Sequence, residues 1–300
     1  MLSYLHEFHA GNHADILKHV TLLYVLEYLN KKNKPYSFFD THAGAGLYEL
    51  DSEEALKTGE AARGIQKLLF QNNIPSELHS YVSFVKECLL KKYYPGSPAI
   101  EVLKALEGSS VFLTELHPKE YKKLESNISI IRENQNSSVV RILNESGWDI
   151  LKKQIPPALK RGAVLCDPSY EELSDYHNAA KSLSEVHKKW NGSTLMLWYP
   201  LLANKSDEID SMKQHILSTV KNRDIHTEVL DARLCIDSED SHKETSLQDA
   251  IGSAKPRLYG SGMFVVNPSW GLSEHLIGIL PYLAELLGKD GNGSYKVELL

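Results

Sequence analysis

The sequence predicts an α/β chain of the Rossmann-like class, in which helices cover both faces of a mainly parallel sheet. Three observations support this fold class. Short apolar stretches alternate with helical patterns along most of the 300 residues, and the first apolar stretch leads directly into a Gly-Ala-Gly turn. The composition, with 42% hydrophobic and 24% charged residues, is that of an ordinary globular protein rather than a disordered or fibrous one.

The first long helix is expected over residues 13–30. Asn12 suits its N-cap and Asp15 its third position, as in a capping box. Apolar residues at spacings of three and four predict one buried face: Ile16, Val20, Leu23, Leu26 and Leu29. Residues 31–35 end the helix with three lysines and a proline, and the short aromatic stretch 36–41 then predicts a buried strand.

Six further strands are expected after this one, which makes a seven-stranded sheet. They are residues 111–114, 139–143, 163–166, 194–198, 226–230 and 263–266. Helical patterns such as residues 119–127 and 177–189 separate most of these strands. This alternation predicts βαβ units whose neighbouring strands run parallel.

The connection between the first two strands is about seventy residues long, far more than a single crossover needs. An amphipathic stripe predicts a helix inside it: Leu78, Tyr81, Val82, Val85, Cys88 and Leu89. Ser97 and Pro98 predict the start of another helix. We therefore divide the chain into residues 1–46 (N-terminal helix and first strand of the core), 47–95 (a small helical insertion subdomain) and 96–300 (the remainder of the core).

Composition and charge exclude several classes of protein. The longest apolar stretches, such as residues 194–202, are far shorter than the roughly 20 residues of a membrane span, and residues 1–6 do not resemble a secretory signal. The three cysteines are too widely spaced for a disulfide framework or a zinc knuckle. The net charge of −6 permits a nucleic-acid partner without requiring one. We expect a cytoplasmic protein with no membrane partner.

Ligands of an open parallel sheet bind beyond the carboxyl ends of the strands, so the residues that follow each strand are the candidate site. Residues 40–46 (Asp-Thr-His-Ala-Gly-Ala-Gly) follow the first strand, and their glycines let the backbone approach a ligand; a structural tight turn is the alternative. Glu49 replaces the third glycine of a dinucleotide fingerprint, which disfavours a nicotinamide oxidoreductase. Glu115 ends the second strand and suits paired ribose hydroxyls, although many strand-end glutamates bind nothing. Asn144, Glu145, Ser146 and Gly147 follow the third strand.

The fourth strand leads into Asp167, Pro168, Ser169 and Tyr170, the most specific pattern in the chain. The Asp167 carboxylate and a backbone carbonyl at Pro168 could accept both hydrogens of an exocyclic amine on a base. Such an amine is a poor nucleophile because its lone pair is delocalised into the ring, and two acceptors would favour the pyramidal form. Tyr170 could stack on a flipped-out base. A capping aspartate in a strand-end turn is the simpler interpretation.

Two other patterns favour no site. Residues 267–270 (Asn-Pro-Ser-Trp) look similar, but if the sheet is of the methyltransferase type they follow an antiparallel strand, so they would face the opposite edge of the sheet and be structural. His9 and His13 could share a helix face, but no neighbouring carboxylate completes a ligand set. We expect no metal.

Several segments together resemble the bacterial 23S ribosomal RNA adenine-N6 methyltransferase J family. In chain order they are residues 1–4 (Met-Leu-Ser-Tyr), 9–15 (His-Ala-Gly-Asn-His-Ala-Asp) with Lys18 and His19, 40–46, 93–98 (Tyr-Tyr-Pro-Gly-Ser-Pro), 113–118 (Leu-Thr-Glu-Leu-His-Pro), 167–171 (Asp-Pro-Ser-Tyr-Glu), 197–200 (Leu-Trp-Tyr-Pro) and 261–263 (Ser-Gly-Met). The resemblance spans nearly the whole chain. It implies a class I methyltransferase core with a small helical subdomain, which transfers a methyl group from S-adenosylmethionine to N6 of the adenine at position 2030 of 23S ribosomal RNA.

The resemblance also implies roles for single residues. Asp167 would be the catalytic carboxylate, Tyr4 would contact the RNA, and the cofactor would be held by His19, His42, Ser97 and Glu115. The strand-end patterns add Pro168 and Tyr170 to the catalytic group. They add Gly44 and Gly46 to the cofactor site. The resemblance adds Asp167 itself, and also Ser146 and Gly147, which stand where family members have Asp-Gly near the cofactor adenine. The family implies a monomer as well.

The sequence departs from the family at two positions. Family members commonly have Asp-Pro-Pro-Tyr where this chain has Ser169, and Asp-Gly where it has Ser146 and Gly147. Two alternatives stay open. One is a DNA or small-molecule amino-methyltransferase, because Asp-Pro-x-Tyr serves those substrates too. The other is a cofactor-binding RNA module whose departures have abolished turnover.

Overall fold

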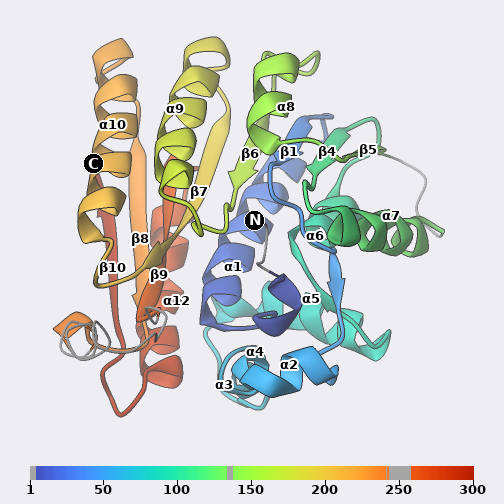
Figure 1. Ribbon diagram of the computed structural model, residues 1–300, viewed down its shortest axis with the longest axis vertical. Helices are drawn as coiled ribbons and strands as arrows, with labels where there is room; N and C mark the ends of the chain where they lie inside the picture. The colour runs from blue at the N-terminus through green and yellow to red at the C-terminus, as the bar shows by residue number, and fades with distance from the viewer. Residues whose placement is uncertain (1–4, 134–137, 241, 243–257) are drawn as a thin grey trace.

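The computed structural model describes residues 5–133, 138–240, 242 and 258–300. At its centre lies an eight-stranded sheet (Figure 1). Its strands are β1 (Ser37–Asp40), β4 (Ser110–Thr114), β5 (Val139–Leu143), β6 (Gly162–Cys166), β7 (Thr194–Leu201), β8 (Val229–Cys235), β9 (Gly260–Val266) and β10 (Ser294–Leu299). Their order across the sheet is β10-β8-β9-β7-β6-β1-β4-β5.

The sheet is parallel from β5 to β7 and antiparallel beyond. β1 pairs in parallel with β4 and β6, β4 with β5, and β6 with β7. β9 is antiparallel to both of its neighbours, β7 and β8, and β10 is antiparallel to β8. The α/β class with a mainly parallel sheet is therefore confirmed, as is the antiparallel direction of the strand predicted at residues 263–266.

The expected number of seven strands is wrong, because β10 was missed. Its sequence, Ser-Tyr-Lys-Val-Glu-Leu, alternates polar and apolar residues, and all six are exposed or only half-buried. This pattern is typical of an edge strand with one face in solvent, whereas the prediction relied on continuous apolar stretches. β8 also starts later than the predicted strand at residues 226–230, because residues 226–228 lie in the turn and the short irregular segment that precede it.

Helices cover both faces of the sheet, as the doubly wound class requires. α8 (Gly147–Gln154), α9 (Leu173–Lys189) and α10 (Ser206–Arg223) cover one face, in front in Figure 1; α1 (His13–Asn30), α6 (Ser97–Lys104), α7 (Pro118–Arg132) and α12 (Leu272–Leu287) cover the other. The buried side chains accordingly separate into two clusters. Successive residues of β1 alternate between them, with Phe38 in the first cluster and Phe39 in the second.

The predicted insertion, residues 47–95, contains mainly helices. They are α2 (Glu53–Thr58), α3 (Glu60–Arg63), α4 (Ile65–Leu69), a short 3-10 turn (Ser76–Leu78) and α5 (His79–Leu90). Two short strands, β2 (Leu47–Tyr48) and β3 (Tyr94–Pro95), pair at its ends, so the chain leaves the core and returns at one place. Its buried residues share one core cluster with α1, and the three-part division of the chain stays a prediction.

α1 begins where expected, with the Asn12 side chain accepting a hydrogen bond from the Asp15 backbone N–H at 2.9 Å. It differs from the prediction in being buried on nearly all sides, because the sheet, the insertion and α12 surround it. Its buried residues include polar ones, among them Asp15, Lys18 and His19. None of the helices in the described part of the chain combines the length and apolar character that crossing a bilayer requires.

Candidate active site

The candidate site lies where β1, β4 and β6 end. β1 is hydrogen-bonded to β4 on one side and β6 on the other, so the segments that follow these three strands meet at one edge of the sheet. Asp40 is the last residue of β1, Glu115 directly follows β4, and Asp167 directly follows β6. Three acidic side chains from distant parts of the chain are thus placed at the edge predicted to bind ligands.

The turn after β1 depends on its glycines. Gly44 and Gly46 have φ values of 62° and 81°, in the left-handed region that favours glycine. A Cβ atom on Gly44 would lie 2.5 Å from the Tyr48 hydroxyl oxygen. The backbone N–H of Gly44 donates to Glu115 Oε2 at 2.8 Å, and the carbonyl of Gly46 accepts from the Gly96 N–H at 2.9 Å.

Glu115, which follows the neighbouring strand β4, accepts hydrogen bonds that hold this turn in place. Its Oε1 accepts a second backbone hydrogen bond, from the His117 N–H at 2.6 Å. Burial raises the pKa of the Glu115 carboxyl above its usual value. Both of its oxygens therefore accept backbone hydrogen bonds, and its expected role on a ribose stays a prediction.

Ser97 and Asp40 are brought together across the insertion. Ser97, expected as the N-cap, is instead the first residue of α6, and Gly96 is the N-cap, so the helix begins one residue earlier than predicted. Its Oγ donates to Asp40 Oδ2 at 2.7 Å, and the His42 N–H donates to Asp40 Oδ1 at 3.0 Å. Burial raises the pKa of Asp40 to about 6. Sequence reasoning gave Asp40 no role, although it belongs to the predicted loop.

His42 and Gly147 lie on the opposite side of the same loop. The His42 ring packs edge-on against Trp148 with centroids 4.8 Å apart, and burial lowers its pKa to about 4. Gly147 starts α8 so close to β1 that a Cβ atom would lie 2.2 Å from the Thr41 carbonyl oxygen. Ser146, the N-cap of α8, makes no side-chain cap hydrogen bond.

Asp167 is paired with a buried lysine that sequence reasoning did not assign. Lys18 Nζ lies 2.6 Å from Asp167 Oδ2 and 3.0 Å from Asp15 Oδ1. Burial alone would lower the pKa of Lys18, but the carboxylates of Asp15 and Asp167 raise it above its ordinary value. The sequence did contain one signal for this buried pair, because Lys18 is a charged residue within an otherwise largely apolar helix.

Asp15 anchors the other end of this ion pair. Its Oδ2 accepts from the Gly11 N–H at 2.8 Å and lies 3.0 Å from His6 Nε2. Burial acts against ionisation, yet His6, Lys18 and His19 hold the pKa of Asp15 well below its usual range. The start of α1 is thereby tied to the candidate catalytic carboxylate.

His19 lies deeper in the same helix. Its Nδ1 is 3.1 Å from the Tyr94 hydroxyl, and its ring is fully buried, so burial lowers its pKa to about 3. Its Nε2 has no hydrogen-bond partner among the described residues; the nearest acidic oxygen, Asp15 Oδ1, is 3.8 Å away. The structure places His19 behind the site, and its contact with a cofactor stays a prediction.

Tyr170 packs into the core. It has a positive φ of 54°, its hydroxyl donates to the Trp198 carbonyl at 2.8 Å, and its ring lies 4.6 Å from that of Tyr176. Only 8% of Tyr170 is exposed, so a stacking role on a base stays a prediction. Pro168 is buried beside it. Tyr4 lies outside the described residues.

The Asn-Pro-Ser-Trp segment lies away from the site, as predicted. Asn267 follows the antiparallel strand β9, and its side-chain amide donates to the carbonyls of Asn191 at 2.7 Å and Ser193 at 2.9 Å, just before β7 begins. This is the amino end of β7, the edge opposite the candidate site. Within the described ranges no group of three or more His, Cys, Asp and Glu side chains is arranged to hold a metal ion.

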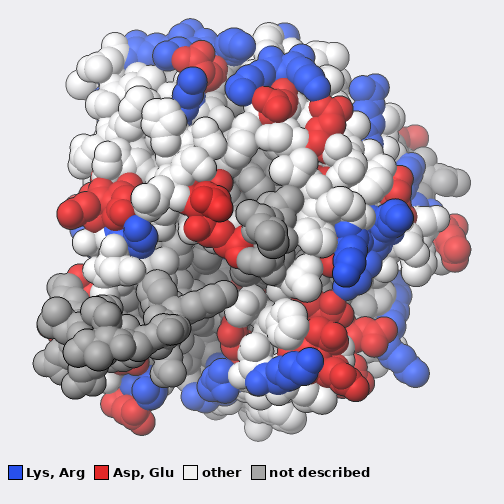
Figure 2. All heavy atoms as spheres, in the orientation of Figure 1, with Lys and Arg blue, Asp and Glu red and all other residues white. Residues whose placement is uncertain are grey.

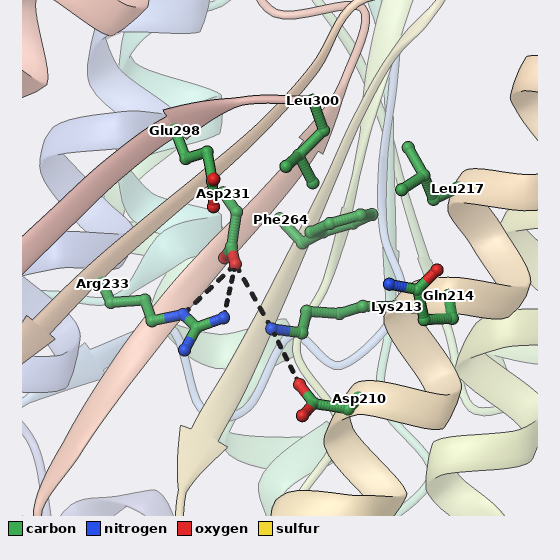
Figure 3. A pocket seen from close by; sticks show the side chains of 9 residues that line it. All are labelled: Asp210, Lys213, Gln214, Leu217, Asp231, Arg233, Phe264, Glu298 and Leu300. Atoms are coloured by element: carbon green, nitrogen blue, oxygen red, sulfur yellow. Dashed lines mark hydrogen bonds and ion pairs between the residues drawn. The ribbon is translucent and has the colours of Figure 1, made fainter.

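A cavity of about 210 Å³ lies far from the site, between α10 and strands β8 and β10. Figure 3 shows Lys213 and Arg233 both pointing at Asp231. Asp231 accepts from Lys213 at 3.2 Å, from Arg233 at 2.8 Å and from the Tyr199 hydroxyl. These charges satisfy one another inside the fold, so we interpret the cluster as structural.

Comparison with known proteins identifies a family that matches most of the chain. The family model described as ribosomal RNA large subunit methyltransferase D, RlmJ, matches residues 33–300. The ribosomal RNA large subunit methyltransferase J of Escherichia coli (strain K12) is 37% identical over 298 residues, 98% of this chain and 96% of the relative. The protein of the same name from Haemophilus influenzae is 35% identical over 302 residues, 99% and 98% of the two chains.

A solved structure has a similar fold over nearly the whole chain. The crystal structure of a Legionella pneumophila protein has a TM-score of 0.78 and 27% identity, covering 97% of this chain and 98% of that one. The range matched by the family model, residues 33–300, includes the glycine turn, the start of α6 and the Asp167 segment. The chain belongs to the RlmJ family of ribosomal RNA large subunit methyltransferases.

Proposed function

We propose that this protein transfers a methyl group from S-adenosylmethionine to N6 of one adenine, position 2030, in 23S ribosomal RNA. The observation that carries the proposal is the position of Asp167, at the end of β6 beside the glycine turn of β1. Family membership supports ribosomal RNA as the substrate. The Asp-Pro-Ser-Tyr sequence supports an exocyclic amine as the acceptor.

The residues present fit the cofactor. The left-handed Gly44 and Gly46 allow close approach of backbone to ligand, and the buried Nε2 of His19 still has a hydrogen bond to make. In this proposal Glu115 holds the ribose, and Ser97 holds the methionine part at the start of α6. His19 and His42 complete the cofactor site together with Ser146 and Gly147. When bound, the cofactor supplies an electrophilic methyl group.

Asp167 and the Pro168 carbonyl would orient the acceptor amine. Lys18 contacts Oδ2 of Asp167, which leaves Oδ1 to accept one amine hydrogen while the carbonyl accepts the other. The Asp167 side chain is 15% exposed, so a base can reach it. The Asp-Pro-Ser-Tyr motif contains one carboxylate and no histidine that could take up a proton from it. Asp167 therefore stabilises the positive charge that develops on nitrogen, and the proton leaves during or after methyl transfer.

Basic side chains of α8, α9 and α10 gather at the edge of the sheet opposite the candidate site. Figure 2 shows acidic and basic side chains interspersed over one face, with basic ones gathered along one end of the molecule. The last turns of α8, α9 and α10 each contain two or more basic residues. These helices start near the site and end at the opposite edge of the sheet, and Lys152 and Lys188 are already paired with Asp149 and Glu185. Basic residues there are also what helix dipoles favour.

The proposal is tested by incubating the protein with labelled S-adenosylmethionine and unmodified 23S ribosomal RNA. Nuclease digestion and mass spectrometry should find N6-methyladenine at a single position. Asp167→Asn should lose at least about a hundredfold in rate, because it removes the charge facing the amine. Asp149→Asn, an exposed aspartate at the start of α8, is the matched control and should keep full activity.

The alternatives predict different results. Methylation of DNA or free nucleosides in preference to RNA would identify another amino-methyltransferase. Cofactor and RNA binding with no transfer would identify a non-catalytic module. Near-full activity of Asp167→Asn would refute the catalytic assignment. We also propose a monomer, which light scattering coupled to size-exclusion chromatography tests.

A further inference from the structure

Glu101 is a buried acid in this site that neither the motifs nor the proposed mechanism uses. It lies on α6, four residues after Ser97, so both side chains are on the same face of that helix. Glu101 is 0% exposed, and no N–H or O–H among the described residues reaches either of its carboxyl oxygens. The carboxyl group that it contacts is that of Asp40, which is also 0% exposed.

Two ionised carboxylates cannot lie together in such a place without a large repulsion and a large desolvation cost. Asp40 already accepts from Ser97 Oγ at 2.7 Å and from the His42 N–H at 3.0 Å, as an ionised carboxylate would. Glu101 has no such donors. The geometry therefore places the proton on Glu101, whose O–H can donate to Asp40.

We infer that Glu101 is a positioning residue, which holds a proton between its own carboxyl group and that of Asp40 and thereby keeps Asp40 bound to Ser97 and to the His42 backbone. The inference rests on the proposed role of Ser97 in cofactor binding. With Glu101 neutral, the pair carries one negative charge, and three donors converge on Asp40. If Glu101 loses its proton, repulsion drives the two carboxylates apart and disturbs both the start of α6 and the glycine turn.

The surrounding charges agree with this assignment. Burial and the nearby Asp40 raise the pKa of Glu101 well above its ordinary value, while Lys18 on α1 acts weakly in the other direction. Lys18 is itself paired with Asp15 and Asp167. Tyr36, which precedes β1, also faces Glu101, and burial keeps its hydroxyl neutral by raising its pKa. Of the two remaining groups near the pair, Asp167 adds negative charge and His42 is neutral at pH 7.

The test compares the wild type with Glu101→Gln, Glu101→Ala and the exposed control Glu107→Gln. Isothermal titration with S-adenosylhomocysteine, which shares the cofactor's adenosine and amino-acid parts, is run from neutral to alkaline pH, because burial and the nearby Asp40 raise the pKa of Glu101 well above its ordinary value. Wild-type affinity should fall toward the alkaline end. Glu101→Gln keeps a donor to Asp40 but has no proton to lose. Over the same pH range, its loss of affinity for S-adenosylhomocysteine should be at least about fivefold smaller than that of the wild type. Glu101→Ala should bind about tenfold more weakly at pH 7, as expected for a lost hydrogen bond to a charged group.

Infrared spectra of protein labelled with ¹³C-glutamate give an independent measurement. A protonated-carboxyl band should be present at pH 7 in the wild type and in Glu107→Gln, and absent from Glu101→Gln. No such band would refute the shared proton. The band together with an unaltered pH profile in Glu101→Gln would refute the positioning role. Failure of the wild type to bind S-adenosylhomocysteine at any pH would refute the cofactor site and the positioning role with it, while the band would still decide where the proton lies.

Discussion

Replacing Lys18 by methionine keeps the aliphatic stem of the side chain but removes the cation between Asp15 and Asp167. The Lys18 side chain is 6% exposed, and its two partners are 1% and 15% exposed. Removing one member of a buried ion pair costs about 3–5 kcal/mol, because a charge is left unpaired. Asp15 keeps its bonds to the Gly11 N–H and His6, so we expect the lower end of this range, ~3 kcal/mol. At about 2 °C per kcal/mol for a chain of this size, Tm should fall by ~6 °C.

Differential scanning calorimetry at pH 7 measures this change. The matched control is Lys153→Met, which removes an exposed pair with Glu145, 58% and 40% exposed, and should change stability by less than about 0.5 kcal/mol. Combining Lys18→Met with Asp167→Asn should cost less than the sum of the two, because the unpaired charge is then gone. A Tm for Lys18→Met within about 1 °C of the wild type, or a loss of stability no larger than that of Lys153→Met, would show that the buried ion pair does not stabilise the fold.

Three further measurements test the site. Gly147→Ala should destabilise the protein by about 1–3 kcal/mol and impair cofactor binding, because the added Cβ would overlap the Thr41 carbonyl. Gly192→Ala is the control and should be nearly neutral, because a Cβ there would have no atom within 4 Å. Equal effects of the two substitutions would contradict the close approach of Gly147 to Thr41. The His42 ring should titrate in NMR spectra near pH 4, and a midpoint near 6.5 would contradict its burial. The pKa of Asp15 is lower in the folded than in the unfolded state, so its stabilisation is present above about pH 4 and lost on acidification. Urea unfolding should therefore find that Asp15→Asn costs most near pH 7 and progressively less below pH 4, and a pH-independent cost would contradict this.

Much of the fold could be predicted because its signals are local. The strand at residues 36–41 and the helix at 13–30 each depend on their own apolar pattern and on the residues that begin and end them. β10 could not be found in this way, since an edge strand buries too little to require an apolar stretch. The burial of α1 on all sides also depends on which elements surround it, and its own periodicity predicted one buried face.

The site was predictable to the extent that strand ends define it. Asp167, Glu115 and the glycine turn were found because parallel strands bring their carboxyl ends to one edge. The ion pair between Lys18 and Asp167 joins residues 149 positions apart, and no local pattern connects them. The contact of Asp40 with Ser97 likewise spans the whole insertion. The burial of Tyr170 follows from a hydroxyl–carbonyl bond to β7, which the motif does not contain.

The order of strands in the sheet has a consequence for synthesis on the ribosome. β9 lies between β7 and β8 in space but follows both of them in the chain. A nascent chain that has emerged only as far as residue 240 therefore contains both neighbours of β9 without the strand that joins them. The facing edges of β7 and β8 then have unpaired backbone groups, which can pair with the wrong strand or with another chain. Closure of the sheet has to wait until residues 260–266 have left the exit tunnel, so slow translation beyond residue 240 should prolong an aggregation-prone state.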